Sequence, residues 1–176
     1  GVNGVITHGG PFTDAQMSNN VVIACSNLTL ASGAKIDVTS KGWAGGFANS
    51  QGYGPGRGAR AQTAAGYGGW GGGAYDIGTE RSGQVYGSAT EPFAPGSGGG
   101  DAGRYSSRVG NGGGAVRIEA AGAVTVDGVI SANGGNSAGW NTGAGSGGGI
   151  YISCRTIGGG GSITADGGTA GGDGYS

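Results

Sequence analysis

The sequence predicts an all-β domain of the parallel β-solenoid type that carries long glycine-rich insertions. Three observations support this fold class: 49 of the 176 residues are Gly, three segments of the chain align with one another, and apolar residues alternate within each segment. Glycine inside a helix or strand costs about 0.5–1 kcal/mol relative to Ala, so this composition excludes a helical bundle. Collagen is also excluded, because collagen has Gly at every third position and abundant Pro, whereas these glycines cluster irregularly among only 4 Pro.

Each aligned segment contains three short expected strands, and the segments cover about residues 20–41, 115–135 and 149–168. The clearest strands begin these segments, at Val21–Cys25, Val116–Ala120 and Ile150–Cys154. Three strands in a repeat of about 20 residues are typical of one solenoid coil, which buries its apolar face only by stacking on its neighbours. We therefore expect residues 1–176 to form a single β-rich domain.

Alternation with period two indicates which face of each strand is buried. In the second segment, Val116, Ile118 and Ala120 are expected to point inward, and Arg117 and Glu119 outward. Turn sequences of the Asp-Gly and Asn-Gly type separate the strands. The same dipeptides favour hairpins, so an antiparallel β-sandwich or prism is the alternative fold.

A long insertion, residues 42–114, separates the first two segments. It holds 25 of the 49 glycines and 9 of the 13 aromatic residues. A structureless loop of this length inside a compact domain would argue against the fold assignment. Backbones without Cβ atoms approach one another closely, however, and form hydrogen bonds as extended chains. We expect the insertion to be a packed lobe whose path the sequence does not specify.

Charge and apolar patterning exclude two classes of partner. The formal net charge is −1, with 9 basic and 10 acidic residues scattered along the chain. Nucleic-acid binding requires clustered Lys and Arg, so no nucleic-acid partner is expected. No run approaches the roughly 20 apolar residues that a membrane span needs. The sequence begins Gly1-Val2-Asn3 without a signal-like segment, which favours a processed product or an excised fragment.

Glycine-rich motifs recur in a fixed order along the chain. Residues 86–100 read YGSATEPFAPGSGGG, residues 112–118 GGGAVRI, residues 129–135 VISANGG and residues 145–150 GSGGGI. This series resembles the glycine-rich repeat region of large secreted or surface-exposed microbial proteins, in which a YGS…GSGGG segment precedes GGG-strand units ending in ISANGG. The resemblance covers roughly residues 20–175. It implies an extracellular β-rich module and brings no catalytic residues with it.

Two short motifs match catalytic or nucleotide-binding patterns by chance. Residues 135–139 fit G-x-S-x-G, but no helix is expected after them. Residues 66–71 fit G-x-G-x-x-G without the strand and helix that bind a dinucleotide. His8 is the only histidine.

Acidic residues offer weaker candidates for chemistry. A pair of carboxylates for glycan hydrolysis could be drawn from four acids in the insertion: Asp76, Glu80, Glu91 and Asp101. Calcium is a candidate at residues 99–101 or 171–174, although both stretches are incomplete against the calcium-binding repeat pattern. Ordinary surface acids and turns explain these residues better, and we expect neither an enzyme nor a cofactor.

Four aromatic residues are candidates to face a ligand: Trp43, Trp70, Tyr75 and Trp140. Exposed Trp and Tyr rings provide stacking surfaces for sugars or partner proteins. The competing interpretation, which we favour, is that the aromatic rings form the core of a lobe that otherwise has only Gly and Ala to bury.

Cys25 and Cys154 occupy the same inward register in the first and third segments, and Ala120 occupies it in the second. A disulfide needs Cα atoms about 4.4–6.8 Å apart, and stacked strands lie about 4.8 Å apart. Coils stacked in chain order would separate the two cysteines by about 9.6 Å, which is two spacings. They could pair only if the first coil folded back beside the third, or if the third coil of one molecule docked on the first coil of another. Two unpaired buried thiols are the other alternative.

The preferred function is a non-enzymatic extracellular structural module, secreted or at the cell surface, that assembles with itself. Neither terminus looks like a polar cap, and open strand edges promote head-to-tail pairing into a filament. The first alternative is a carbohydrate- or receptor-binding adhesin module. A polysaccharide-active β-helix enzyme is a second and weaker alternative.

Overall fold

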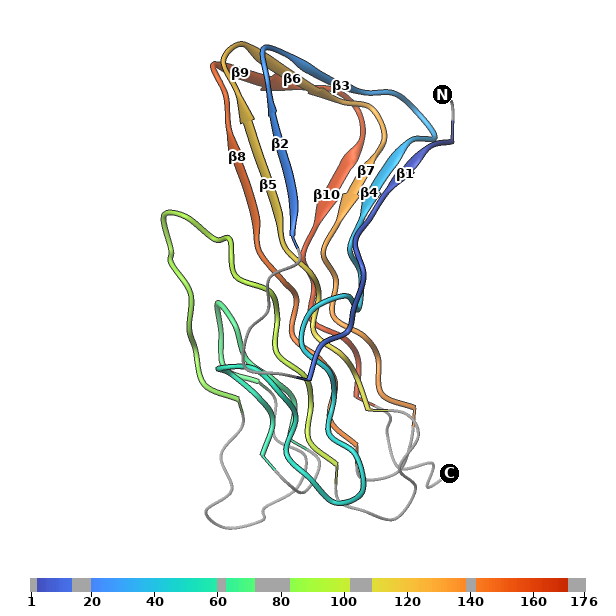
Figure 1. Ribbon diagram of the computed structural model, residues 1–176, viewed down its shortest axis with the longest axis vertical. Helices are drawn as coiled ribbons and strands as arrows, with labels where there is room; N and C mark the ends of the chain where they lie inside the picture. The colour runs from blue at the N-terminus through green and yellow to red at the C-terminus, as the bar shows by residue number, and fades with distance from the viewer. Residues whose placement is uncertain are drawn as a thin grey trace.

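The computed structural model describes residues 3–13, 20–59, 63–71, 83–101, 109–138 and 142–170. In this part of the chain every regular element is a strand, and the strands form three stacked coils (Figure 1). The coils consist of β2 (Val21–Cys25), β3 (Leu28–Leu30) and β4 (Lys35–Asp37); of β5 (Val116–Ala120), β6 (Ala123–Val126) and β7 (Val129–Ser131); and of β8 (Ile150–Ser153), β9 (Thr156–Gly158) and β10 (Ser162–Thr164).

The coils stack in chain order and build three parallel sheets, which form the three sides of the solenoid in Figure 1. The sheet orders are β2-β5-β8, β3-β6-β9 and β4-β7-β10. Equivalent inward residues lie in register, as where Ile23 pairs with Ile118 and Ile118 with Ile152. The predicted parallel solenoid is confirmed, and the antiparallel alternative is excluded because each paired strand among the described residues runs parallel to its neighbour.

A further strand, β1 (Val5–Ile6), lies on β4 outside the first coil. Val5 pairs with Lys35 and Ile6 with Ile36. β1 therefore occupies the third-strand position of an additional coil. Among the described residues, the sheet that contains β1 has four strands and each of the other two sheets has three.

The hydrophobic core lies between the three sheets and is most complete in the middle coil. Val116, Ile118 and Ile130 are fully buried there because a coil covers each side of them. Removing such a side chain from water contributes about 1.5–3 kcal/mol. Arg117 and Glu119 alternate with them and point outward, as predicted, where the guanidinium donates to the Glu119 carboxylate at 2.6 and 2.9 Å.

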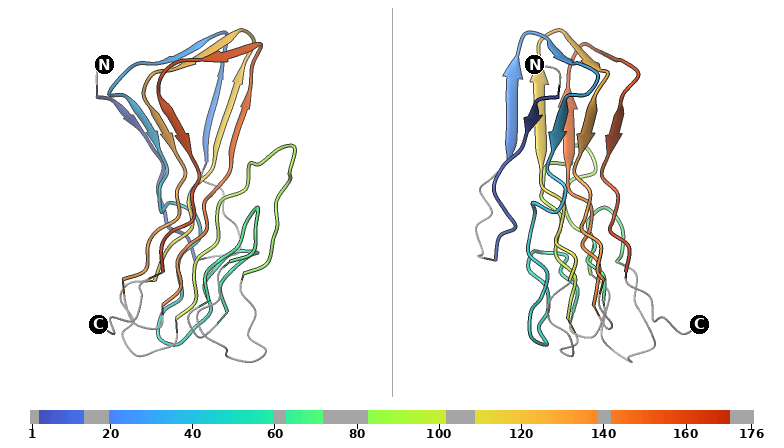
Figure 2. Two further views of the ribbon diagram at one scale, coloured as in Figure 1. Left: turned by 180° about the vertical axis from the view of Figure 1, so that it is seen from behind. Right: turned by 90° about the vertical axis from the view of Figure 1, so that its right-hand side faces the viewer.

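Below the solenoid, glycine-rich segments run as extended chains that bond to several neighbours at once (Figure 2). Within residues 96–100, the Gly96 N–H donates to Gly113 at 2.7 Å and the Gly99 N–H to Gly110 at 3.0 Å, whereas the Gly98 N–H donates to Tyr53 at 3.0 Å. Gly96 and Gly99, which are three residues apart, thus donate to the same neighbouring segment, residues 110–113. Three residues per turn is the period of the polyproline II helix, which forms no internal hydrogen bonds and must bond outward.

The close approach of these backbones explains why glycine is required in the lobe. A Cβ atom added to Gly112 would lie 1.8 Å from the Gly96 carbonyl oxygen, and one added to Gly98 would lie 1.9 Å from the Ala44 carbonyl oxygen. Both contacts are with backbone, which has little freedom to move away. Glycine therefore makes the packing of backbone on backbone sterically feasible.

This packing predicts different effects for two Gly→Ala substitutions in the lobe. Gly112→Ala should lower the free energy of unfolding by at least about 1–3 kcal/mol, because overpacking forces the backbone to shift. Gly68→Ala is the matched control: an added Cβ meets no described atom within 4 Å there, so stability should be unchanged or rise by up to about 1 kcal/mol. Urea denaturation followed by circular dichroism measures both. Equal destabilisation by the two variants would contradict this account of the lobe.

Candidate functional site: the open ends of the solenoid

The C-terminal end of the solenoid exposes side chains that are buried in the coil before it. Ile157 on β9 is 57% exposed and Ile163 on β10 is 44% exposed, whereas Val124 and Ile130, their counterparts in the second coil, are at 1% and 0%. The difference arises because no described segment stacks on the third coil. The result is an apolar surface bordered by the unpaired edges of β8, β9 and β10.

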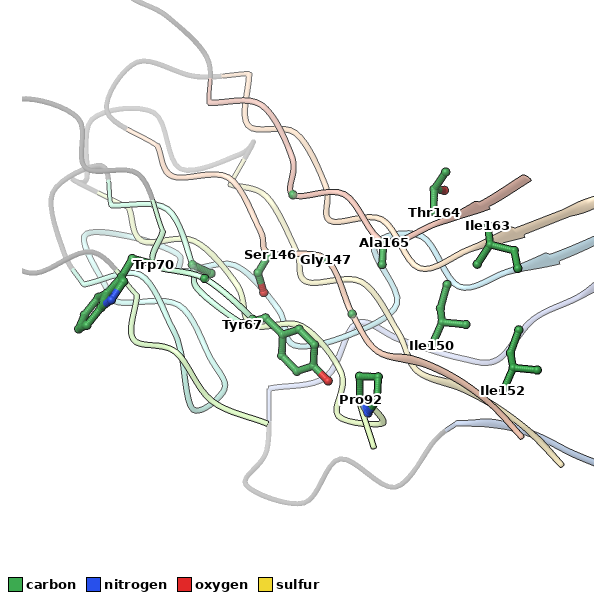
Figure 3. Close-up of a pocket in the computed structure, with 15 residues that line it drawn as sticks. Tyr67, Trp70, Pro92, Ser146, Gly147, Ile150, Ile152, Ile163, Thr164 and Ala165 are labelled. Carbon is green, nitrogen blue, oxygen red and sulfur yellow. The ribbon is translucent and has the colours of Figure 1, made fainter. Parts of the chain in front are cut away.

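A cavity of about 670 Å³ opens between this end and the glycine-rich lobe. Ile150, Ile152 and Ile163 line it from the solenoid, while Tyr67 and Trp70 line it from the lobe (Figure 3). The three isoleucines are inward residues of the third coil, so the cavity is continuous with the open core. Most of the residues that line it are apolar or Gly.

The N-terminal end is only partly covered. β1 shields the edge of β4, but the edges of β2 and β3 carry no further strand among the described residues. Ile23, Cys25 and Leu28 are partly buried there. β1 itself is weakly covered, with Val5 58% and Ile6 46% exposed.

The two cysteines line the core in one register with Ala120. Both thiols are free. Stacking in chain order places the second coil between them, so an intramolecular disulfide does not form: two strand spacings, about 9.6 Å, exceed the reach of a disulfide.

The candidate ligand-facing aromatic residues differ in their surroundings. Trp43 is only 8% exposed and forms a parallel backbone bridge with Phe12, so its ring belongs to the packed interior of the lobe. Trp70 is 64% exposed at the rim of the cavity. Tyr75 and Trp140 lie outside the described residues.

Two tyrosines that were not among these candidates form a further part of the lobe core. The Tyr67 and Tyr86 rings meet edge to face, with centroids 4.9 Å apart. The Tyr86 hydroxyl donates to the Pro95 carbonyl and accepts from the Ser97 hydroxyl. Burial raises the pKa of Tyr86 far above its usual value. The sequence did not predict this contact, because tyrosines recur throughout the glycine-rich segments and nothing marks these two as a pair.

The candidate acidic residues are not brought together as a site in the described structure. Asp101 is fully buried and accepts a hydrogen bond from the Asn49 N–H at 3.4 Å, so it organises the backbone of the lobe. Glu91 lies exposed in a loop, and Asp76 and Glu80 fall outside the described residues, as does the calcium candidate at 171–174. The described residues contain no cluster of three His, Cys, Asp or Glu suited to a metal ion.

The chance motifs likewise have structural roles. Ser137, in the G-x-S-x-G stretch, is buried and donates its hydroxyl to the Thr142 carbonyl at 2.9 Å. Residues 66–71 are extended and turn-like, with no helix following in the described residues.

Asp37, on β4, ties the first coil to the second. Burial raises the pKa of its carboxyl, but hydrogen bonds from the Thr39 N–H at 3.0 Å and the Ser131 hydroxyl at 2.8 Å outweigh burial, so the pKa is lowered. The carboxylate is thus held in its charged form by the fold. Its hydrogen bond to Ser131 is directed toward the second coil, away from the edge that β1 covers.

Comparisons with known proteins add no assignment, since no protein-family model, curated protein or solved structure matches the chain. Within the described residues there is no helix of the length and apolarity needed to span a membrane. The open ends are therefore the candidate site on structural grounds alone.

The difference between Trp43 and Trp70 predicts different costs of truncation. Trp43→Ala should lower the free energy of unfolding by about 3–5 kcal/mol, because it empties a packed position. Trp70→Ala should change it by less than about 0.5 kcal/mol, as is usual for exposed positions. Thermal and urea denaturation of both variants measure this, and a large loss in Trp70→Ala would show that this ring is also core.

Proposed function

We propose that this chain is a non-enzymatic structural module that assembles head to tail into an extracellular filament, at a cell surface or in a matrix. The observation that carries the proposal is that both ends of the stack present strand edges in the same three-sheet arrangement, with apolar inward residues behind them. The third coil ends in uncovered parallel strands whose inward residues follow the same register that joins the three coils within the chain. A second copy that repeated this relation would continue the sheets.

The energetics favour such stacking. Ile157 and Ile163 are about half exposed in one copy, and covering apolar surface contributes about 25 cal/mol per Å². Unpaired strand edges add backbone hydrogen bonds when they are joined. Because the two surfaces in contact are different ends of the molecule, the contact does not close, and repetition generates a fibre.

The extracellular location rests on the resemblance of the glycine-rich motifs to secreted and surface-exposed microbial proteins. The fold is compatible with that setting, because adjacent coils are joined by short-range stacking and the module lengthens by repetition of one contact. The location and the filament are separate parts of the proposal, and a measurement of assembly tests the filament.

A carbohydrate-binding module is the second candidate, favoured by the exposed Trp70 ring at the mouth of the cavity. An exposed indole is a suitable stacking surface for a sugar ring. Binding on a glycan array that is lost in Trp70→Ala would support this candidate.

The filament predicts that a charge at the open end prevents assembly without unfolding the monomer. Ile157→Lys places an ammonium where the next coil would stack, and Ile157 is already 57% exposed. We expect the wild type to elute as a concentration-dependent series and to form fibres in electron micrographs. The Ile157→Lys variant should remain monomeric with an unchanged thermal midpoint.

Thr156→Lys is the matched control, because Thr156 is exposed on the same strand and alternates to the opposite, outward face. This variant should assemble like the wild type. A wild-type protein that stays a monodisperse monomer over a hundredfold range of concentration would refute the filament.

A further inference from the structure

The two ends of the solenoid do not match directly, because β1 occupies one strand position on the N-terminal end. The sheet containing β1 has one strand more than each of the other two sheets in the described chain. A copy arriving at this end brings three strands, β8, β9 and β10. Only the positions on β2 and β3 are vacant among the described residues, whereas the position on β4 is taken by β1.

Two arrangements of the incoming copy are geometrically distinct. If β10 pairs with the β1 of the next copy, β8 lies two strand spacings, about 9.6 Å, from β2 and forms no hydrogen bonds with it. If β8 pairs with β2 and β9 with β3, then β10 must occupy the place of β1. The first arrangement leaves two of the three sheets broken, and the second makes all three continuous.

We propose that head-to-tail assembly proceeds by strand exchange, in which β10 of one copy displaces β1 of the next copy and pairs with its β4. This inference rests on the proposed self-assembly and specifies its interface. β1 is then a temporary cover for the edge of β4, and the binding surface for a second copy is the combined edge of β2, β3 and β4.

The pairing that is gained exceeds the pairing that is lost. β1 pairs with β4 at two positions. Within the chain, the third coil pairs with the second at four positions through β8, three through β9 and three through β10. The same strands stacked on the first coil of another copy would form a comparable set.

The segment that contains β1 also makes few favourable contacts on β4. The side chains of Val5 and Ile6 are about half exposed. His8, which follows β1, has its Nε2 atom buried with no hydrogen-bond partner among the described residues. A buried polar atom without a partner is unfavourable, and displacement of the segment would allow this nitrogen to bond with water.

The inward side chains fit the exchanged arrangement. Ile6 and Ile130 both pair with Ile36, one on each side of β4, and Ile163 pairs with Ile130 at the same register position. In the exchanged stack Ile163 of one copy takes the place of Ile6 on Ile36 of the next. Ile152 then stacks on Ile23, and Cys154 on Cys25.

Engineered cysteine pairs distinguish exchange from simple addition. Ser162 on β10 lies in the register of Lys35 on β4 and of Val5 on β1, and the structure leaves all three side chains exposed. Exchange places Ser162 one spacing from Lys35 of the next copy, whereas simple addition places it one spacing from Val5 of the next copy. Val129 separates Ser162 from Lys35 within one chain, so neither pair closes intramolecularly.

The two test proteins are Ser162→Cys/Lys35→Cys and Ser162→Cys/Val5→Cys, both also carrying Cys25→Ala and Cys154→Ala. Alanine occupies the equivalent register at position 120. Oxidised glutathione supplies the oxidising equivalents: one protein thiolate displaces glutathione to form a mixed disulfide, and the second thiolate displaces the other glutathione. Each bond therefore releases two reduced glutathione molecules.

We expect a covalent ladder on non-reducing gels for the Ser162→Cys/Lys35→Cys protein and none for the Ser162→Cys/Val5→Cys protein. A ladder in the second protein, alone or with the first, would overturn strand exchange but leave head-to-tail assembly intact. Fibres without a ladder in either protein would also overturn it. The absence of both fibres and ladders in these proteins and in the wild type would instead refute the proposed assembly.

The natural cysteines provide a second readout in the unaltered chain. Exchange places Cys154 one spacing, about 4.8 Å, from Cys25 of the next copy, which is within the range of a disulfide. Simple addition places them two spacings apart, which is outside it. Wild-type protein oxidised with glutathione should therefore form a ladder that collapses on reduction, whereas wild-type fibres without a ladder would count against exchange.

Discussion

The structure depends on backbone packing against backbone at positions where a Cβ atom has no room. The connection from each coil to the next passes through the glycine-rich lobe, so the lobe determines how the coils meet. Its hydrogen bonds lead directly into the sheets: the Gly114 N–H donates to Val38 at 2.7 Å and the Val116 N–H donates to Gly149 at 2.9 Å. The register of β5 against its neighbours is thus already set where the chain leaves the lobe, which lowers the entropic cost of pairing strands far apart in sequence.

The outer surface and the ends of the solenoid differ in the groups that they expose. Arg117 on β5 lies over the rings of Phe93 and Tyr151, at 5.4 and 5.0 Å from their centroids, and pairs with Glu119 beside it. This side of the β2-β5-β8 sheet is therefore occupied by charged and aromatic groups in contact with each other. Apolar inward residues become accessible at the ends of the stack, where backbone edges are also unpaired, so apolar and hydrogen-bonding surfaces coincide there.

The sequence was sufficient to predict the solenoid because apolar residues recur at every second position of the strands that begin its coils. In β5 the inward Val116 and Ile118 alternate with the outward Arg117 and Glu119, and apolar residues occupy the same inward register in β2 and β8. β1 escaped prediction because two residues are too short for alternation to be seen. Its pattern Val-Ile-Thr is nevertheless the counterpart of Val-Ile-Ser at residues 129–131 and Ser-Ile-Thr at 162–164, a similarity that would have indicated an extra third strand.

The sequence predicted that the lobe is packed, but it did not predict the path of the backbone through the lobe. The extended segments repeat every three residues, and glycine has no side chain that would show this period in the sequence. The burial of Trp43 was hidden for the same reason. Its neighbours in the fold are the backbone of Gly96 and the distant Phe12, and nothing in the local sequence distinguishes it from Trp70. Where neighbours are backbone atoms, the pattern of residue types carries little information about burial.

The short length of β1 makes the proposed strand exchange compatible with the proposed growth of a filament. A complete coil at the N-terminal end would cover β2, β3 and β4 together, and its displacement would cost as much pairing as an incoming coil restores. With two paired positions, β1 protects one edge in the single copy, in the way that short edge strands commonly limit unwanted pairing. The same strand is too small to compete with the three strands of a second copy. A cover of this size would slow the pairing of a second copy with β4 in the wrong register. The fully stacked arrangement would still be favoured, because a copy that also pairs with β2 and β3 gains enough hydrogen bonds to replace β1.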